Sequence, residues 1–249
     1  MANFGSRTLL GNTISVINLS TDTVIDVVNV RAGPAGIAIK PDSSRAYVTN
    51  LGGIDDPIDS QAGITVSVID IATNTVIKEV TVGVGPLGIA ITPDGSKAYV
   101  TNFGSITSLD ASDPGNTVSV INLGTNTVID EVSVGFGPAG VAITPDGSKA
   151  YVSNLDTVNE FFGGLGALSD PGKTVSVIDA GTNQVMSTIT VGNRPFGIAV
   201  THDGTMTYVA NYLSGTVSVI NVSTNSVIAT IPMGITDFTD HSIMVSCNV

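Results

Sequence analysis

The sequence repeats one pattern of short strands and turns along its whole length. Four tyrosines mark the same position in successive repeats and are spaced 52, 52 and 57 residues apart, namely Tyr47, Tyr99, Tyr151 and Tyr208. A long repeat made of short strands is typical of arrays in which each unit buries its apolar surface against its neighbours. Because no linker interrupts the repeats, we expect a single domain over residues 1–249.

One repeat divides into four strand candidates separated by turn residues. Residues 87–92 form a short apolar run, and the turn 93–96 joins this run to a second strand at 97–102. Residues 117–122 and 127–134 carry the alternating pattern of a third and an outermost strand. Four antiparallel strands per unit, repeated around an axis, form the blade of a β-propeller, so the sequence predicts an all-β fold.

The repeats predict five such blades. Five outermost strands can be counted, whereas the inner strands number four clear copies and a degenerate fifth at 242–246. The first residues read as the end of a second strand, followed by a third strand at 13–18 and an outermost strand at 23–30. Pairing of strand 242–246 with these N-terminal strands would complete the first blade and close the ring, which removes exposed sheet edges. An open arc completed by another subunit is the alternative.

The acidic composition limits the class of partner. The chain has 21 acidic and 9 basic side chains and a net charge of -12. Because nucleic-acid binding depends on clustered basic side chains, we expect no nucleic-acid partner. The sequence contains neither an apolar run long enough for a membrane span nor an N-terminal export signal. Cys247 is the only cysteine, so no intrachain disulfide framework is expected. The cysteine content therefore does not indicate the cellular compartment.

One motif within the repeat resembles a known family. Residues 47–50 and 99–102 read Tyr-Val-Thr-Asn, and residues 151–154 and 208–211 differ from this motif at one position. The chain is similar over its whole length to the YVTN family of β-propeller repeats, which includes surface-layer proteins. Similar propellers also include lactonase-like hydrolases, a streptogramin lyase and cofactor-bearing oxidoreductase domains. The resemblance implies the propeller fold and an extracytoplasmic or cell-surface location, and leaves the function open.

The asparagine that ends each motif is predicted to be structural. Because it is present in every blade, we expect it to hydrogen-bond the backbone at the blade ends rather than a ligand.

Three long insertions are predicted to build one surface. They follow the second strands at 51–63, 103–116 and 155–173, whereas the corresponding connection at 212–215 is short. In a propeller these connections lie at the same end as the connections from each outermost strand to the next inner strand. We call this the loop-rich end, and we expect it to bind a protein or a small ligand, since loops on a rigid scaffold commonly carry function. Phe161 and Phe162 either contact that partner or pack over the blade.

Carboxylates in these insertions are candidate calcium ligands. Calcium takes roughly six to eight oxygen ligands, commonly from flexible loops. No EF-hand spacing is present, and the Asp-Pro-Gly triplets at 113–115 and 170–172 are common turn formers, so solvated turns are the alternative. The candidates are Asp55, Asp56, Asp59, Asp113 and Asp170.

Departures from the repeated Gly-Pro-x-Gly turn are candidate binding residues at the mouth of the channel. Arg31 and Phe136 vary the residues before the proline, and Arg194 with Phe196 pairs a planar cation with an aromatic ring. Such a pair suits an anionic or ring-bearing ligand. In the alternative, Phe196 plugs the channel and Arg194 neutralises nearby carboxylates.

The degenerate fifth copy of this turn contains a local cluster of carboxylates and imidazole. Asp237, Asp240 and His241 could bind a metal ion or supply a general base with its orienting partner. The alternative is a solvated terminus.

Two classes of function follow. The favoured interpretation is a non-enzymatic recognition or surface-structural propeller, because the sequence lacks a Gly-x-Ser-x-Gly elbow, a His-Glu-x-x-His motif, a P-loop and a haem-attachment motif. The alternative is a metal-dependent, lactonase-like hydrolase or lyase that acts at the channel mouth. Calcium is the one cofactor that the sequence suggests, and the chain could also form an oligomer.

Overall fold

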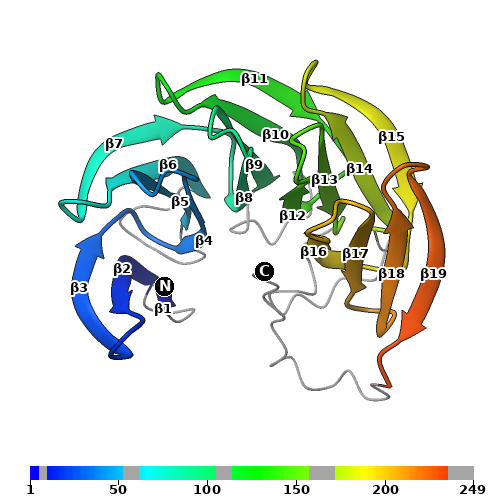
Figure 1. Ribbon diagram of the computed structural model, residues 1–249, viewed down its shortest axis with the longest axis horizontal. Coiled ribbons are helices and arrows are strands. Elements are labelled where there is room, and N and C mark those ends of the chain that lie inside the picture. Colours follow the sequence, from blue (N-terminus) through cyan, green and yellow to red (C-terminus); the bar gives the residue numbers. More distant parts are fainter. Residues whose placement is uncertain (6–9, 53–61, 105–113, 157–171, 235–249) are drawn as a thin grey trace.

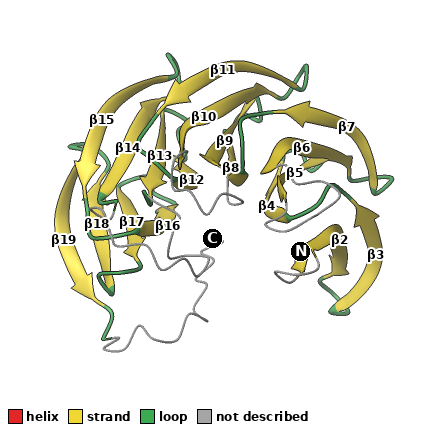
Figure 2. Ribbon diagram, turned by 180° about the vertical axis from the view of Figure 1, so that it is seen from behind, coloured by secondary structure: helices red, strands yellow, loops and turns green. Residues whose placement is uncertain are grey.

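The chain forms five antiparallel β-sheets arranged as an arc around a common axis (Figure 1). The computed structural model describes residues 1–5, 10–52, 62–104, 114–156 and 172–234. These residues contain nineteen strands and no helix (Figure 2). The predicted all-β fold of five propeller blades is therefore confirmed. Within the same residues, no helix is long and apolar enough to cross a membrane.

Each complete sheet is one sequence repeat, with its strands in chain order. The first sheet has three described strands, β1 (Ala2–Gly5), β2 (Leu10–Asn18) and β3 (Thr23–Asn29). The second sheet comprises β4 (Pro34–Ile39), β5 (Arg45–Gly52), β6 (Ala62–Asp70) and β7 (Thr75–Thr81), and the third β8 (Pro86–Ile91), β9 (Lys97–Gly104), β10 (Pro114–Asn122) and β11 (Thr127–Ser133). The fourth comprises β12 (Pro138–Ile143), β13 (Lys149–Asn154), β14 (Thr174–Asp179) and β15 (Gln184–Thr190), and the fifth β16 (Pro195–Val200), β17 (Met206–Asn211), β18 (Thr216–Asn221) and β19 (Ser226–Pro232).

The hairpin turn between the first two strands of a blade is fixed by an aspartate. Asp94 accepts hydrogen bonds from Thr92 Oγ1 at 2.6 Å and from the Ser96 N–H at 3.0 Å, and Gly95 follows it with φ of 68°. The Thr92 bond and the two bonds from Ser96 lower the pKa of Asp94, because they stabilise its charged form. The predicted Pro-Asp-Gly turn is thus a self-contained unit that sets the register of the inner hairpin.

Neighbouring sheets are joined by the tyrosine of the repeated motif. Tyr47, Tyr99 and Tyr151 are fully buried between sheets. Their hydroxyls donate to the Oδ1 atoms of Asn126, Asn183 and Asn225 of the next sheet, at 2.7, 2.9 and 2.8 Å respectively. Each asparagine adopts a positive φ, between 49° and 55°, in the turn before an outermost strand. The same contact at three junctions gives the sheets the same relative placement.

A second contact joins the sheets close to the axis. The hydroxyl of Thr49 donates to the Leu87 carbonyl at 2.8 Å, and Ser153 makes the same bond to Phe196 at 2.6 Å. Gly88 illustrates the close packing there, because a Cβ atom on it would lie 2.4 Å from the carbonyl oxygen of Ala139 in the next sheet. Only glycine fits where the backbones of two sheets come this close, so the repeated Gly-Pro-x-Gly turn is structural.

The repeated asparagines are also structural, but through different bonds from those predicted. The Asn50 amide donates to Thr65 Oγ1 at 3.0 Å and to Ser67 Oγ at 2.9 Å, and Asn102, Asn154 and Asn211 repeat this pair of bonds. The expectation of backbone partners was wrong, because the third strand places two hydroxyl side chains opposite the amide. These bonds tie the second strand to the third within each sheet.

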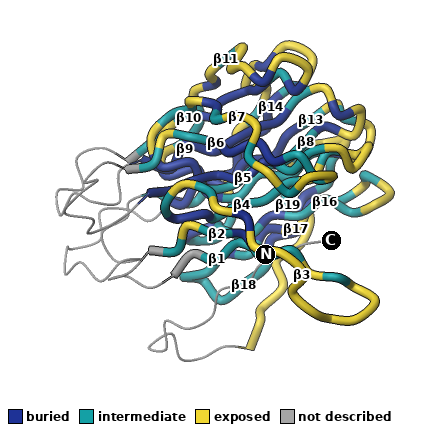
Figure 3. The backbone as a smooth tube through the Cα atoms, turned by 90° about the vertical axis from the view of Figure 1, so that its left-hand side faces the viewer, coloured by how far each residue is buried: buried dark blue, intermediate teal, exposed yellow. Residues whose placement is uncertain are grey.

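The interior of the arc is apolar and its outer strands are solvated. Figure 3 shows buried residues through the middle strands and exposed residues along the outermost ones. One further apolar cluster, Leu51, Phe103, Ala139 and Leu155, collects residues from the second, third and fourth sheets, with Phe196 of the fifth packed against it. Since this cluster contains the inner-strand residues next to the repeated prolines, we call it the axial cluster.

Ring closure depends on a segment outside the described residues. The strand predicted at 242–246 falls in 235–249, which the description does not cover. Among the described strands, β1 pairs only with β2, and no strand of the first sheet pairs with the fifth sheet. The closing strand therefore stays a prediction.

The tyrosine junction predicts a position-dependent loss of stability. Replacing Tyr47 by Phe removes the donor to buried Asn126, so we expect the free energy of unfolding to fall by about 1–2 kcal/mol. Tyr208→Phe is the matched control, because Tyr208 is 41% exposed, and it should change the value by less than about 0.5 kcal/mol. Urea unfolding at low protein concentration measures both. Equal losses in the two variants would contradict the assigned role of the bond.

Alkaline pH should unfold the protein through the same side chains. Burial raises the pKa of Tyr99 and of Tyr151 to about 12, from an ordinary value near 10. The unfolded chain therefore loses these protons first, so stability is complete below pH 10 and falls as the pH rises to about 12. A double variant, Tyr99→Phe with Tyr151→Phe, should lose less stability over this interval than the wild type. Urea unfolding at a series of pH values tests this, and parallel curves would contradict it.

Candidate functional site

A pocket opens beside the fourth sheet at the loop-rich end. It has a volume of about 390 Å³ and is lined by Phe136, Asn154, Asp156, Lys173, Thr174 and Thr190, among others. These residues come from the connection between β11 and β12, the end of β13, the start of β14 and the end of β15. The predicted convergence of the two sets of connections at one end is thus visible at this pocket, which we call the fourth-sheet pocket.

Backbone hydrogen bonds hold the walls of the pocket together. The Asp156 N–H donates to the Phe136 carbonyl at 3.0 Å, and the Leu155 N–H donates to the Gly137 carbonyl at 2.9 Å. On the other wall, the Lys173 carbonyl accepts a bond from the Val191 N–H at 2.7 Å. The side chains of Phe136, Asp156 and Lys173 are therefore mounted on backbone that is fixed by the sheet.

Phe136 is an aromatic residue that only this connection carries. It is 54% exposed. The equivalent position is Ala32, Val84 or Asn193 in the other connections between sheets. A half-exposed phenyl ring at the rim of a pocket offers an apolar face to a ligand.

The two charged residues of the pocket also depart from the repeat. Asp156 adopts φ of 69° at a position where the second and third sheets have Gly52 and Gly104. Aspartate adopts the left-handed conformation more readily than most residues with a side chain, so Asp156 keeps the backbone conformation of the glycines and adds a carboxylate. Lys173 stands where those sheets have Ile64 and Asn116. Both charges are therefore additions to the scaffold rather than parts of it.

Asn154 belongs to the scaffold although it lines the pocket. Its Oδ1 is buried and has no hydrogen-bond donor among the described residues, which is equally true of Asn50, Asn102 and Asn211. Because all four sheets share this feature, it does not distinguish the fourth-sheet pocket from the rest of the array.

The lining offers several polar groups and one apolar ring. It provides an aromatic ring, one carboxylate, one ammonium group and the hydroxyls of Thr174 and Thr190. Within the described lining there is no serine, cysteine or histidine that could form a nucleophile with an adjacent base. The chemistry on offer is therefore that of a polar ligand with one apolar face.

Arg194 and Phe196 lie elsewhere, in two different environments. Arg194 is 4% exposed and has φ of 53°, at the position of Gly33, Gly85 and Gly137. Its N–H donates to the Gly172 carbonyl at 2.8 Å and its carbonyl accepts from the Tyr212 N–H at 2.9 Å. Phe196 packs against the axial cluster. These two side chains do not line the fourth-sheet pocket.

The other predicted site residues are dispersed or lie outside the described residues. Arg31 is exposed, in the connection that precedes β4. The remaining candidates are outside the described ranges, namely Asp55, Asp56, Asp59, Asp113, Phe161, Phe162, Asp170, Asp237, Asp240 and His241. Within the described ranges, no group of three or more His, Cys, Asp or Glu residues is placed to hold a metal ion. A calcium site in the insertions therefore stays a prediction.

Sequence reasoning identified Phe136 as a candidate binding residue and Asp156 only as one of the carboxylates of the insertions, and it did not identify Lys173. The signal was available, because both positions differ in kind from their equivalents in the second and third repeats. What the sequence lacked was the geometry that brings these two positions together with Phe136.

Comparison with known proteins identifies similar propellers. No family model matches the chain. It is 30% identical over 168 residues to the seven-bladed beta-propeller protein Rv1057 of Mycobacterium tuberculosis (strain ATCC 25618 / H37Rv), which covers 67% of this chain and 35% of that protein. It is also 47% identical over 60 residues to the PE-PGRS family protein PE_PGRS18 of the same organism, over 24% of this chain and 11% of that protein. The matches therefore span about a third or less of these two relatives.

A solved structure has the same fold. The hydrazine synthase of Kuenenia stuttgartiensis superposes with a TM-score of 0.59 over 90% of this chain and 81% of that chain, at 19% sequence identity. At this identity the likeness concerns the fold alone. Together the comparisons support a β-propeller related in sequence to a mycobacterial propeller.

Proposed function

We propose that the protein is a non-enzymatic recognition or surface-structural propeller that binds a ligand or partner at its loop-rich end. The observation that carries this proposal is the convergence of Phe136, Asp156 and Lys173 on the fourth-sheet pocket. Positions that repeat in every sheet serve the scaffold, whereas these three differ from their equivalents and gather at one place. Selection for a site explains such a set better than selection for the array does.

The rest of the scaffold supports a binding role. Most buried hydroxyl and amide groups of the repeat are engaged in holding strands and sheets together, as in the bonds of Tyr99 and Asn102. These bonds assign the repeated side chains to the scaffold. We further propose that the repeats are of the YVTN kind and that the protein acts outside the cytoplasm or at a cell surface, in line with the Tyr-Val-Thr-Asn motifs.

Phe136 gives the sharpest test of the binding site. A library of small sugars, amino acids and aromatic acids, screened by saturation-transfer NMR, should yield compounds that bind the wild type and bind Phe136→Ala roughly fivefold more weakly, since an aromatic contact contributes about 1 kcal/mol. Val84→Ala is the matched control, because Val84 occupies the equivalent position and is 43% exposed. Binding by Phe136→Ala that equals the wild type would contradict the assigned site.

The favoured function also predicts an absence of hydrolysis. We expect no turnover of lactone or ester substrates above the buffer rate when Ca²⁺, Mg²⁺, Mn²⁺ or Zn²⁺ is added, because the described lining of the pocket contains no serine, cysteine or histidine. A chromogenic ester and a simple lactone serve as substrates. Hydrolysis that disappears in His241→Ala would instead favour the lactonase-like alternative.

A further inference from the structure

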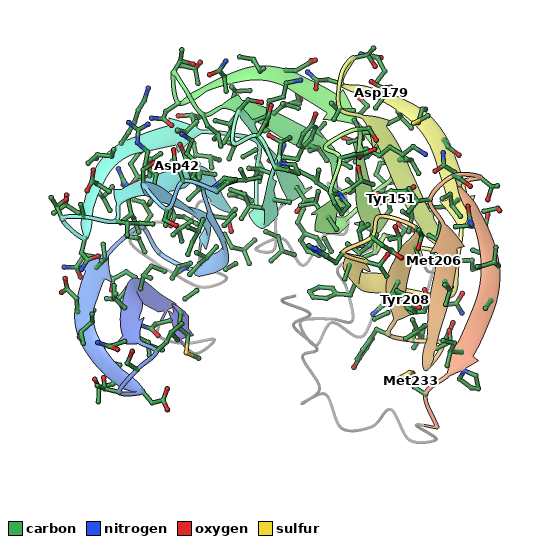
Figure 4. All side chains as sticks on the ribbon, viewed as in Figure 1. Asp42, Tyr151, Asp179, Met206, Tyr208 and Met233 are labelled. Carbon is green, nitrogen blue, oxygen red and sulfur yellow. The ribbon has the colours of Figure 1, made fainter. Side chains whose placement is uncertain are left out.

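The fifth sheet exposes a surface that the other complete sheets bury. In the second, third and fourth sheets, the side turned toward the next sheet carries a tyrosine that is 0% exposed and an outermost-strand aliphatic residue that is 4–6% exposed. In the fifth sheet the equivalent residues are Tyr208, which is 41% exposed, and Ile231, which is 44% exposed. Figure 4 places Tyr151 between the fourth and fifth sheets and Tyr208 at the end of the arc.

This surface is more apolar than its buried counterparts. Met206 stands where the other sheets have Arg45, Lys97 and Lys149, and Ala210 stands where they have Thr49, Thr101 and Ser153. Ala229 replaces Asp26, Lys78, Asp130 and Ser187. Solvent exposure alone would favour polar residues, so the change in the opposite direction indicates a surface that becomes covered. We call Met206, Tyr208, Ala229 and Ile231 the leading face.

The first sheet exposes the complementary surface at the other end of the arc. Ile17 is 40% exposed, whereas its equivalents Ile69, Ile121, Ile178 and Ile220 are 0–4% exposed. Leu19 is 88% exposed, whereas the equivalent Leu123 is 1% exposed. Val27, which is 52% exposed, replaces the polar residues Glu79, Glu131, Thr188 and Thr230. We call Ile17, Leu19, Val24 and Val27 the trailing face.

The trailing face also offers the hydrogen-bond acceptor that Tyr208 needs. Asp22 adopts φ of 52° in the turn before β3, the same place and conformation as Asn126, Asn183 and Asn225. Those asparagines accept the hydroxyl bond from the tyrosine of the preceding sheet. The Asp22 carboxylate can accept the same hydroxyl bond from Tyr208. Because Met206 and Ala229 are apolar, these two residues of the leading face place no second carboxylate beside Asp22.

We propose that the leading face of one copy of this chain binds the trailing face of a second copy. The contact reproduces the junction that already joins the second sheet to the third, with Tyr208 in the role of Tyr47 and Asp22 in the role of Asn126. Within one copy the two faces belong to opposite ends of the arc, and their sheets do not pair in the described structure. Three interior junctions with the same tyrosine bond hold those ends in place.

The geometry of the contact determines the kind of assembly. The two faces are different surfaces, so the contact is head-to-tail and each copy keeps one face for a further neighbour. One arc already curves around most of a ring (Figure 1). A second copy must therefore step along the axis, and successive copies form an open helical assembly rather than a closed ring.

Two charged substitutions and their mixture test this proposal. Sedimentation velocity of the wild type should show association that grows with protein concentration. Tyr208→Glu blocks the leading face and Leu19→Glu blocks the trailing face, so each variant alone should associate at least roughly 30-fold more weakly. An equimolar mixture should form heterodimers, because each variant keeps the face that the other has lost. Ile129→Glu is the control, since Ile129 is 49% exposed on an outermost strand and belongs to neither face, and it should associate like the wild type.

Three outcomes would overturn the proposal. A wild-type chain that stays monomeric up to about 1 mM has no such contact. Nitration of Tyr208 in that monomer distinguishes two explanations. If Tyr208 is protected from nitration, the chain covers its own leading face. If Tyr208 is nitrated, the leading face is open to a different partner. Association that is lost in only one of the two variants means that the contact joins like faces, and a mixture that fails to restore association, while each variant alone is monomeric, means that the two substitutions do not block opposite sides of one contact.

Discussion

The fold depends on one hydrogen bond that passes between sheets. A tyrosine of the second strand crosses the apolar layer and donates to an asparagine of the next sheet, at 2.7–2.9 Å in three successive junctions. Because both groups are buried or nearly so, loss of either partner leaves a polar atom without its bond. The apolar contacts around the tyrosine supply most of the attraction between sheets, whereas this bond fixes the register in which they meet. The fourth-sheet pocket lies on a sheet that carries this bond at both of its junctions.

Much of the fold followed from the sequence because its determinants are local. Strand positions, the Pro-Asp-Gly turn at 93–96 and the division into five blades were all predictable from alternation and turn chemistry, and the observed strands agree within a few residues. The partners of Asn50 were not predictable in this way, since its bonds to Thr65 and Ser67 depend on the register between two strands. For Phe196 the sequence left a ligand contact and packing in the channel as alternatives, and the structure places its ring on the axial cluster, apart from Phe136 at the pocket.

The candidate site could be predicted only in part from the sequence, for a related reason. Phe136 stood out as a departure from its own turn, but Asp156 and Lys173 lie 17 residues apart in the chain on either side of an insertion. Their convergence arises because β13 and β14 pair from Asn154 and Thr174 onward, which brings the two ends of the insertion together. A comparison of equivalent positions between repeats therefore finds the residues, and the sheet pairing shows that they form one site.

The arc also distributes stability unevenly along the chain. Among the described strands each sheet contacts only its neighbours, so within this part of the chain the array is a one-dimensional stack whose first and fifth sheets each have one supporting interface. Local opening should then begin at the first and fifth sheets and move inward, with amide exchange slowest in the middle. The fourth-sheet pocket is built on a unit that has support on both sides. Its side chains can keep their arrangement while the ends of the arc fluctuate.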